Sequence, residues 1–270
     1  MQAAAREVSY LDLQGRTGIT KHIGGPEATE ALLDLCHVDA IGEVLYVGCG
    51  IGVGPACIAK KRGCRVVGVD ISETMLAWSR QRAREDRVAD KVDIRYGDIL
   101  DLPFEDDRFG AVIVESVAVF VEDKARAIAE CVRVARPGGY VGMNEVFWVA
   151  PASAAFAADA RREMGADLLP VADWRALWDA SGLADRVVDV RSIDPRTEVR
   201  ARLRWVGARW ALRAFGRLIA LYVTSPPARR AMMDQLRGTR NFSPALGYGL
   251  FAGRKWADNL PHANPSTTLR

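Results

Sequence analysis

The chain has 270 residues, of which 49% are hydrophobic and 26% are charged, and its net charge is +3. This composition excludes an extensively disordered chain and is typical of one globular domain with a full core. The small net charge does not predict a polyanionic partner, and the five scattered cysteines form no CxxC pair or zinc pattern, so we expect a reducing, cytoplasmic setting and no metal site. No apolar signal segment and no run of eighteen apolar residues is present, so neither secretion nor membrane spanning is expected.

The N-terminal part, residues 1–31, is expected to form a lid or cap, with a polar, glycine-rich stretch at 15–25 and an amphipathic helix beginning at 26 and running to 36. From residue 43 to 145, short β-branched runs alternate with helical patterns, which is typical of a parallel sheet with crossover helices. The pattern therefore predicts an α/β, doubly wound fold. The expected strands are 44–47, 65–69, 92–96, 111–114 and 140–146, and the expected helices are 55–62, 73–85 and 124–134.

The C-terminal half continues with a helix expected at 173–181, a strand at 186–191 and a long helical segment at 197–240. A last strand is expected at 246–252, followed by a polar tail at 257–270 that we expect to be disordered. The main domain is thus predicted to cover residues 32–256, with a helical cap inserted at about 196–240.

A glycine-rich turn follows the first predicted strand, with glycine at positions 48, 50 and 52. Glycine lets the backbone approach a ligand closely, and the next helix points its N-terminus at that ligand. The turn therefore predicts a nucleotide or cofactor cradle, although tight packing alone would also explain it. A dinucleotide is disfavoured, because Val53 stands where the dinucleotide fingerprint requires its third glycine.

Two acidic residues follow the next two predicted strands. Asp70 ends the second strand, where a carboxylate can accept hydrogen bonds from both ribose hydroxyls of an adenosine. Asp98 follows the third strand, where a carboxylate can accept from an adenine amino group while Ile99 packs on the ring. The alternatives are that Asp70 caps the helix that begins near Ser72 and that Asp98 is an ordinary loop residue.

Four ordered motifs carry a family resemblance: VLYVGCGIG at 44–52, VVGVDIS at 66–72, GDILDLPFEDDRFGAVIVES at 97–116 and ARPGGY at 135–140. Over about residues 32–255 the chain resembles the class I S-adenosylmethionine-dependent methyltransferases, and within them the branch that methylates quinones, sterols, tocopherols and phosphoethanolamine. The resemblance implies a Rossmann-like, seven-stranded sheet with helices on both faces and an antiparallel last strand.

The resemblance also implies S-adenosylmethionine as the cofactor and a role for each matching residue. The glycine loop would lie beside the methionyl part, Asp70 on the ribose, and the main chain after the fourth strand on the methionyl and substrate side. The implied cofactor contacts are Gly48, Cys49, Gly50 and Gly52 in the loop, Asp70, Ile71 and Met75 at the adenosine, Asp98 and Ile99 at the adenine, and Glu115 and Ser116 after the fourth strand.

One residue departs from the family pattern. The position two before the first glycine is usually acidic and helps to hold the amino end of the cofactor, whereas here it is Tyr46. Tyrosine cannot repeat that charge interaction. It could present its hydroxyl or ring face to the cofactor's cations, or it could simply pack in the core.

Methyl transfer from a sulfonium is an in-line displacement, so placement and exclusion of water matter most. A general base becomes useful for a hydroxyl or protonated amine acceptor, and the candidates are Glu115, His22 and Glu145, with Glu115 preferred. His22 lies in a Gly-Gly stretch at 21–25 that resembles a turn reaching the cofactor in phosphoethanolamine-type enzymes, although it could equally be a surface residue.

The segment 196–240 is the most basic part of the chain, with eleven arginines against two acidic residues, and it also carries aromatic and aliphatic side chains. It could cover the active site as a substrate cap, lie on an anionic membrane surface, or merely pack on the domain. Nucleic acid is disfavoured, because no RNA module is present and Glu-Ser-Val-Ala stands at 115–118 where a base-modifying enzyme would carry Asn-Pro-Pro-Tyr.

The leading hypothesis is therefore a methyltransferase for a small or lipid- or isoprenoid-like acceptor. The alternatives are a methyltransferase of small amines, or a non-catalytic S-adenosylmethionine-binding or scaffold protein in which Tyr46 marks lost chemistry. No oligomeric state is predicted.

Overall fold

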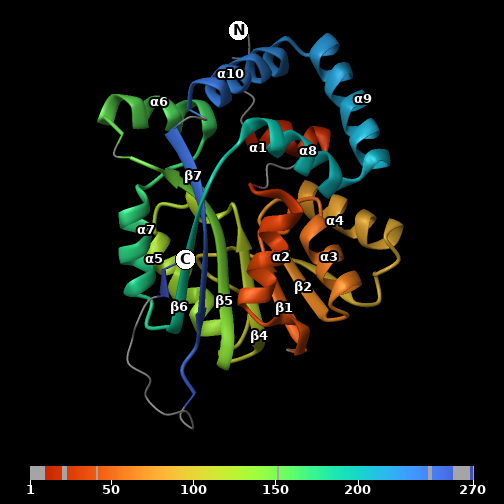
Figure 1. Ribbon diagram of the computed structural model, residues 1–270. Coiled ribbons are helices and arrows are strands. Elements are labelled where there is room, and N and C mark those ends of the chain that lie inside the picture. The colour runs from red at the N-terminus through yellow and green to blue at the C-terminus, as the bar shows by residue number, and fades with distance from the viewer. Residues whose placement is uncertain are drawn as a thin grey trace, which may run out of the picture.

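The computed structural model describes residues 10–19, 23–40, 42–150, 152–242, 245–257 and 268–269. Its centre is one sheet with the strand order β3-β2-β1-β4-β5-β7-β6-β8 (Figure 1). The strands are β1 (Glu43–Val47), β2 (Arg65–Asp70), β3 (Val92–Tyr96), β4 (Phe109–Glu115), β5 (Ala135–Trp148), β6 (Ala184–Ser192), β7 (Leu246–Arg254) and β8 (Thr268–Leu269).

The first five strands pair in parallel, and β7 lies antiparallel between β5 and β6. The predicted seven-stranded sheet with an antiparallel last strand is thereby confirmed. Residues 268–269, which we expected in a disordered tail, form the short edge strand β8 beside β6, and the rest of that tail beyond residue 257 lies outside the described residues.

Helices cover both faces of the sheet, as predicted. The helices are α1 (Tyr10–Thr17), α2 (Gly25–Leu35), α3 (Val53–Lys61), α4 (Glu73–Glu85), α5 (Lys124–Val134), α6 (Ala154–Met164), α7 (Val171–Asp179), α8 (Pro195–Val206), α9 (Ala208–Thr224) and α10 (Pro226–Phe242), with short 3₁₀ turns η1 (Val38–Ala40) and η2 (Ala118–Phe120). Sequence analysis did not predict α1 or α6. None of the helices among the described residues is long and apolar enough to cross a membrane.

Alternate residues of each strand enter different cores, because successive side chains of a strand point to opposite faces. In β1, Leu45 and Val47 join the core that also holds Ile128 of α5. Val44 and Tyr46 join the other core, which is closed by α2, α3 and α4. Burial on both faces explains why β1, β2 and β4 are almost continuously apolar, whereas the edge strand β3 alternates buried and exposed residues.

Helices α1, α8, α9 and α10 lie together beyond the edge of the sheet where the parallel strands end (Figure 1). Helix α8 packs on α2, where the Gly24 amide donates to Glu198 at 2.8 Å, and α9 packs on α1. The expected cap insertion at 196–240 is therefore a three-helix unit. Helix α2 runs through the boundary expected between residues 31 and 32 and packs on β5 and β7 of the sheet.

Candidate active site

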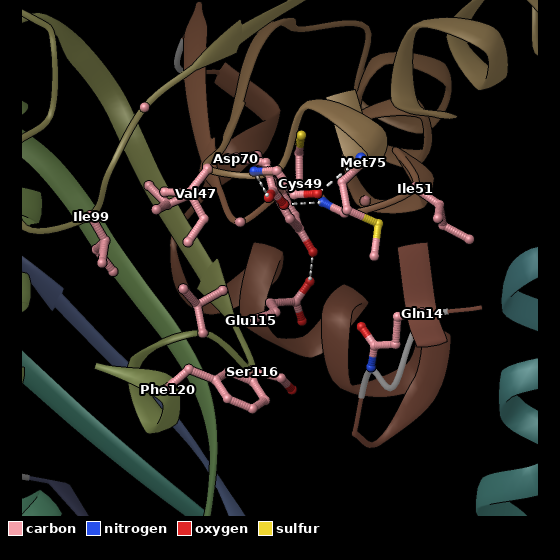
Figure 2. A pocket seen from close by; sticks show the side chains of 18 of the residues that line it. Gln14, Val47, Cys49, Ile51, Asp70, Met75, Ile99, Glu115, Ser116 and Phe120 are labelled. Atoms are coloured by element: carbon pink, nitrogen blue, oxygen red, sulfur yellow. Dashed lines mark hydrogen bonds between the residues drawn. The ribbon is translucent and has the colours of Figure 1, made fainter. Parts of the chain in front are cut away.

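The strand ends and the cap enclose one cavity of about 240 Å³. Figure 2 shows Asp70, Met75 and Glu115 on its wall, with Gln14 of α1 on the cap side. The structure brings together most of the residues predicted from the sequence. Those that line the cavity are Tyr46, Gly48, Cys49, Gly50, Asp70, Ile71, Met75, Asp98, Ile99, Glu115 and Ser116.

The glycine turn between β1 and α3 requires its glycines for steric reasons. Gly48, Gly50 and Gly52 have φ values of 69°, 51° and 80°, which side chains rarely adopt. A Cβ on Gly48 would lie 2.2 Å from Val117 Cγ2, and one on Gly52 would lie 2.5 Å from Ser79 Oγ. Gly52 is not among the cavity residues, and its position allows close packing of α3 against α4.

Asp70 connects the loops that follow β1 and β2. Its Oδ2 accepts from the Gly50 amide and its Oδ1 from the Ser72 amide, both at 2.9 Å. Burial raises the pKa of this carboxyl, although the backbone amides oppose that shift. The N-cap of α4 is Ser72, whose hydroxyl accepts from the Met75 amide, so the alternative that Asp70 caps this helix is wrong.

The neighbouring apolar residues form a slot beside Asp70. Ile71 is 58% exposed although it is a large aliphatic residue, whereas Met75 and Ile99 are buried in the wall. Asp98 ends the slot after β3, and its Oδ1 accepts from the Leu100 amide at 2.9 Å, which fixes the local turn. A flat apolar ring placed on Ile71 would reduce the exposure of that side chain to water.

A buried hydrogen-bond network surrounds Glu115 at the end of β4. The Tyr46 hydroxyl donates to Glu115 Oε2 at 2.6 Å, and the Thr29 hydroxyl donates to Oε1 at 2.9 Å. The Asn144 amide nitrogen lies 3.4 Å from the same Oε1 and also donates to the Ile23 carbonyl at 2.9 Å. Donors from β1, α2 and β5 thus hold one carboxylate in the wall of the cavity.

The ring of Tyr46 occupies space left by Gly54, which has no side chain, in the next helix, α3. A Cβ on Gly54 would lie 2.3 Å from Tyr46 Cζ, so a larger residue at position 54 would displace the ring. Tyr46 is only 4% exposed, and burial together with the Glu115 charge raises the pKa of its phenol well above the ordinary value. The hydroxyl stays protonated and is directed to Glu115 rather than toward a ligand.

The other two proposed bases are not found at the cavity. Glu145 is completely buried and does not line the cavity. Its Oε1 accepts from the Val117 and Ala118 amides at 3.0 and 2.8 Å, so it holds the turn after β4. Burial raises the pKa of Glu145 to about 7. His22 lies outside the described residues.

The cavity residues that sequence analysis did not name include Gln14 of α1, Phe120 of η2 and Trp205 of α8. No local motif marks them, because they reach the cavity through packing of segments distant in sequence. Only Trp205 had a usable signal, as an aromatic residue in the predicted cap. The described residues also include no group of three or more potential ligands that could hold a metal ion.

The chain is similar to known methyltransferases in sequence. Residues 45–143 match a family model described as a methyltransferase domain. Methyltransferase GfsG of Streptomyces halstedii is 33% identical over 122 residues, which cover 45% of this chain and 44% of that protein. The 27-O-demethylrifamycin SV methyltransferase of Amycolatopsis mediterranei (strain S699) is 28% identical over 233 residues, which cover 84% of this chain and 82% of that protein. The chain thus spans less than half the length of the first of these relatives.

Among solved structures, the crystal structure of the [4+2]-cyclase SpnF superposes with a TM-score of 0.70 and 20% identity, and the match covers 92% of each chain. That likeness concerns the fold, which is shared over almost the whole molecule. A shared fold does not by itself indicate a function. The evidence for function comes from the matched methyltransferase-domain model and from the ordered motifs. Over residues 45–143 the chain is therefore similar to methyltransferase domains, in agreement with its motifs, which resemble those of the class I S-adenosylmethionine-dependent methyltransferases.

Proposed function

We propose that this protein binds S-adenosylmethionine in the cavity and transfers the methyl group to a small organic acceptor. The observation that carries the proposal is the convergence of the glycine turn, Asp70, Asp98 and Glu115 on one cavity at the ends of four neighbouring strands. In open α/β sheets, ligands bind outside the carboxyl ends of the strands.

The wall residues fit the adenosine half of this cofactor. Asp70 accepts from the Gly50 and Ser72 amides, one at each carboxylate oxygen, and a carboxylate can accept about four hydrogen bonds in all. Two ribose hydroxyls can therefore bond to Asp70 without displacing Gly50 or Ser72. The adenine would cover the exposed side chain of Ile71, and its amino group would donate to Asp98.

The methionyl half carries an ammonium group, and Glu115 is the carboxylate that we assign to it. In this chain the negative charge usually found on β1 is absent at Tyr46, and Tyr46 instead orients a carboxylate on the neighbouring strand β4. Because donors from three elements already hold Glu115, we assign it to cofactor binding rather than to the base role preferred from the sequence. Tyr46 and Thr29 are then positioning residues.

Bound S-adenosylmethionine supplies an electrophilic methyl group on its sulfonium, and the protein has to place an acceptor opposite that methyl. Gln14, Phe120 and Trp205 line the part of the cavity formed by the cap and by the turn after β4. Two aromatic side chains and one amide favour an acceptor with an apolar body and a hydrogen-bonding group. The relative named as a demethylrifamycin methyltransferase supports an organic acceptor of this kind.

A second candidate function is cofactor binding without methyl transfer. The substitution of the usual acidic residue by Tyr46 favours it, because a weakened methionyl site would reduce productive placement of the methyl group.

The two functions are separated by titration calorimetry with S-adenosylmethionine, followed by transfer of tritium from methyl-labelled cofactor into fractions of a metabolite and lipid extract. We expect binding and enzyme-dependent label in a small-molecule fraction. Binding without transferred label in any fraction would support the second function, and absence of binding would overturn both.

A further inference from the structure

The outward face of α9 carries large apolar side chains in contact with solvent. Leu212, Phe215, Ile219, Tyr222 and Val223 are 74%, 58%, 49%, 45% and 70% exposed. Their spacing of three, four, three and one residues places them on one side of a helix with 3.6 residues per turn. We call these five residues the α9 stripe. A soluble surface rarely leaves so many large apolar residues together without a partner.

The α9 stripe is not needed to attach α9 to the domain. The opposite side of the helix buries Trp210 and Ala214 against the core near Met75, and Leu218 and Leu221 pack around Leu13 of α1. In addition, the Trp210 indole donates to the Gly18 carbonyl at 2.7 Å. The helix therefore has a complete inner face and a second, outer apolar face.

Arginines flank the outer face. Arg209 is exposed on α9 next to the stripe, as is Arg213, which pairs with Glu85 of α4 at 2.9 Å, and α9 contains no acidic residue. On α10, Met233 and Leu236 are 40% and 65% exposed, at helical spacing from the exposed arginines Arg229, Arg230 and Arg237. The Arg229 guanidinium lies 5.8 Å from the Tyr222 ring, which joins the two helices into one surface. Figure 1 shows α9 and α10 at the outer edge of the molecule, beyond the sheet.

We infer that the α9 stripe and the exposed side of α10 bind the surface of an anionic lipid bilayer. Helices that lie in a membrane interface combine an apolar face containing aromatic residues with flanking arginines, whose long stems let the charge reach the lipid phosphates. Each basic residue near such a surface adds attraction to anionic headgroups. A symmetric contact with a second copy fits less well, because it would bring two arginine-rich surfaces together.

The inference can be tested with the intact protein by co-sedimentation with vesicles of phosphatidylcholine alone and of phosphatidylcholine mixed with phosphatidylserine. We expect binding to the mixed vesicles only, weakened by added salt. The triple variant Leu212→Ser, Phe215→Ser and Val223→Ser should bind roughly 100-fold more weakly, because it removes three apolar anchors. The double variant Arg209→Gln and Arg230→Gln should lose the preference for phosphatidylserine.

The matched control is Tyr96→Ser, which removes an aromatic side chain that is 57% exposed at the end of β3 and belongs to neither α9 nor α10. It should bind vesicles as the unchanged protein does, and calorimetry with S-adenosylmethionine checks that every variant is folded, independently of methyl transfer. Three outcomes would overturn the inference: no binding to mixed vesicles, equal loss in the Tyr96→Ser control, or sedimentation velocity showing a dimer that the triple variant abolishes while vesicle binding is absent.

Discussion

At the scale of single residues, the Tyr46 hydroxyl on β1 donates to the Glu115 carboxylate on β4, which our proposal assigns to the methionyl end of the cofactor. Removing the phenol hydroxyl leaves a buried carboxylate with one donor fewer, and such a loss costs about 1–3 kcal/mol. We therefore expect Tyr46→Phe to lower the free energy of unfolding by that amount and to weaken S-adenosylmethionine binding by roughly tenfold. Urea unfolding and calorimetry measure the two effects. A variant with wild-type affinity would show that Tyr46 packs in the core without orienting the methionyl site.

Asp70 gives a second prediction at this scale. If its carboxylate accepts both ribose hydroxyls, Asp70→Ala removes two hydrogen bonds to a charged group, each worth about 1.5–3 kcal/mol. We expect the dissociation constant for S-adenosylmethionine to rise at least 100-fold, a change of about 2.7 kcal/mol. Because the variant also frees the amides of Gly50 and Ser72, thermal unfolding without ligand serves as the control for loop disorder. Unchanged affinity would remove Asp70 from the ribose site.

The residues found from the sequence are those whose role depends on local conformation or on the end of a strand. Gly48, Asp70 and Asp98 follow predicted strands, and parallel strands bring their ends to one edge. The partner of Tyr46 could not be predicted, because the contact between β1 and β4 depends on strand order and on the space left by Gly54. Glu145 lies one residue before the end of the predicted strand 140–146, but its complete burial follows from the packing of that strand against β7.

At the scale of elements, the turn after β4 depends on a buried carboxyl group. Glu145 has a pKa of about 7 in the folded protein against an ordinary value of 4.5, because burial disfavours its charge. Between these two values the folded state binds more protons than the unfolded state, so stability is fully present below pH 4.5 and falls as the pH rises through 7. The loss is about 3 kcal/mol, since each pKa unit corresponds to about 1.4 kcal/mol.

Replacing Glu145 by glutamine should remove this pH dependence. Glutamine keeps an acceptor for the Val117 and Ala118 amides but cannot ionise. We expect Glu145→Gln to be close to the unchanged protein at pH 5 and more stable at pH 8, as measured by urea unfolding at both values. Glu105→Gln, at an exposed site, should leave the profile unchanged. A steep profile that persists in Glu145→Gln would place the titrating group elsewhere.

Helix boundaries were predicted accurately where a capping residue marks the start of the helix in the sequence. Helices α4 and α5 begin and end where predicted, and each has a capping side chain, Ser72 and Asp123, that accepts from an amide of the first turn. Helix α1 was not predicted, and its C-terminal end is held by distant residues that donate to its carbonyls. The Trp78 indole donates to Gly15, the Trp210 indole to Gly18 and the Arg217 guanidinium to Thr17. These contacts come from α4 and α9, so the sequence around α1 could not indicate them.

At the scale of the whole molecule, the fold class followed from the alternation of strand and helix patterns, whereas the arrangement of the cap did not. General rules for strand pairing and for the handedness of crossover connections limit the possible topologies of such a sheet. The cap is assembled from the two ends of the chain: α1 precedes the sheet, and α8 to α10 lie between β6 and β7. Helices α8 to α10 fall in the segment predicted as helical, whereas α1 was not predicted, and the packing of these helices on α1 and α2 depends on tertiary contacts.

Because the cavity is lined by both the sheet and the cap, ligand binding should affect both parts of the molecule. The cavity is lined by Gln14 of α1, by Trp205 of α8 and by the turn after β1, three segments far apart in the sequence. A ligand that binds only the folded state stabilises it by about 2.7 kcal/mol at 100 times its dissociation constant. We expect S-adenosylmethionine to raise the unfolding temperature and to slow hydrogen exchange in all three segments together. Asp70→Ala should lose both effects at the same ligand concentration, whereas the Leu212→Ser, Phe215→Ser, Val223→Ser variant should retain them, because the α9 stripe faces away from the cavity. Protection confined to the turn after β1 would instead mean that the cofactor site is complete within the sheet domain and that the cap closes only around the acceptor.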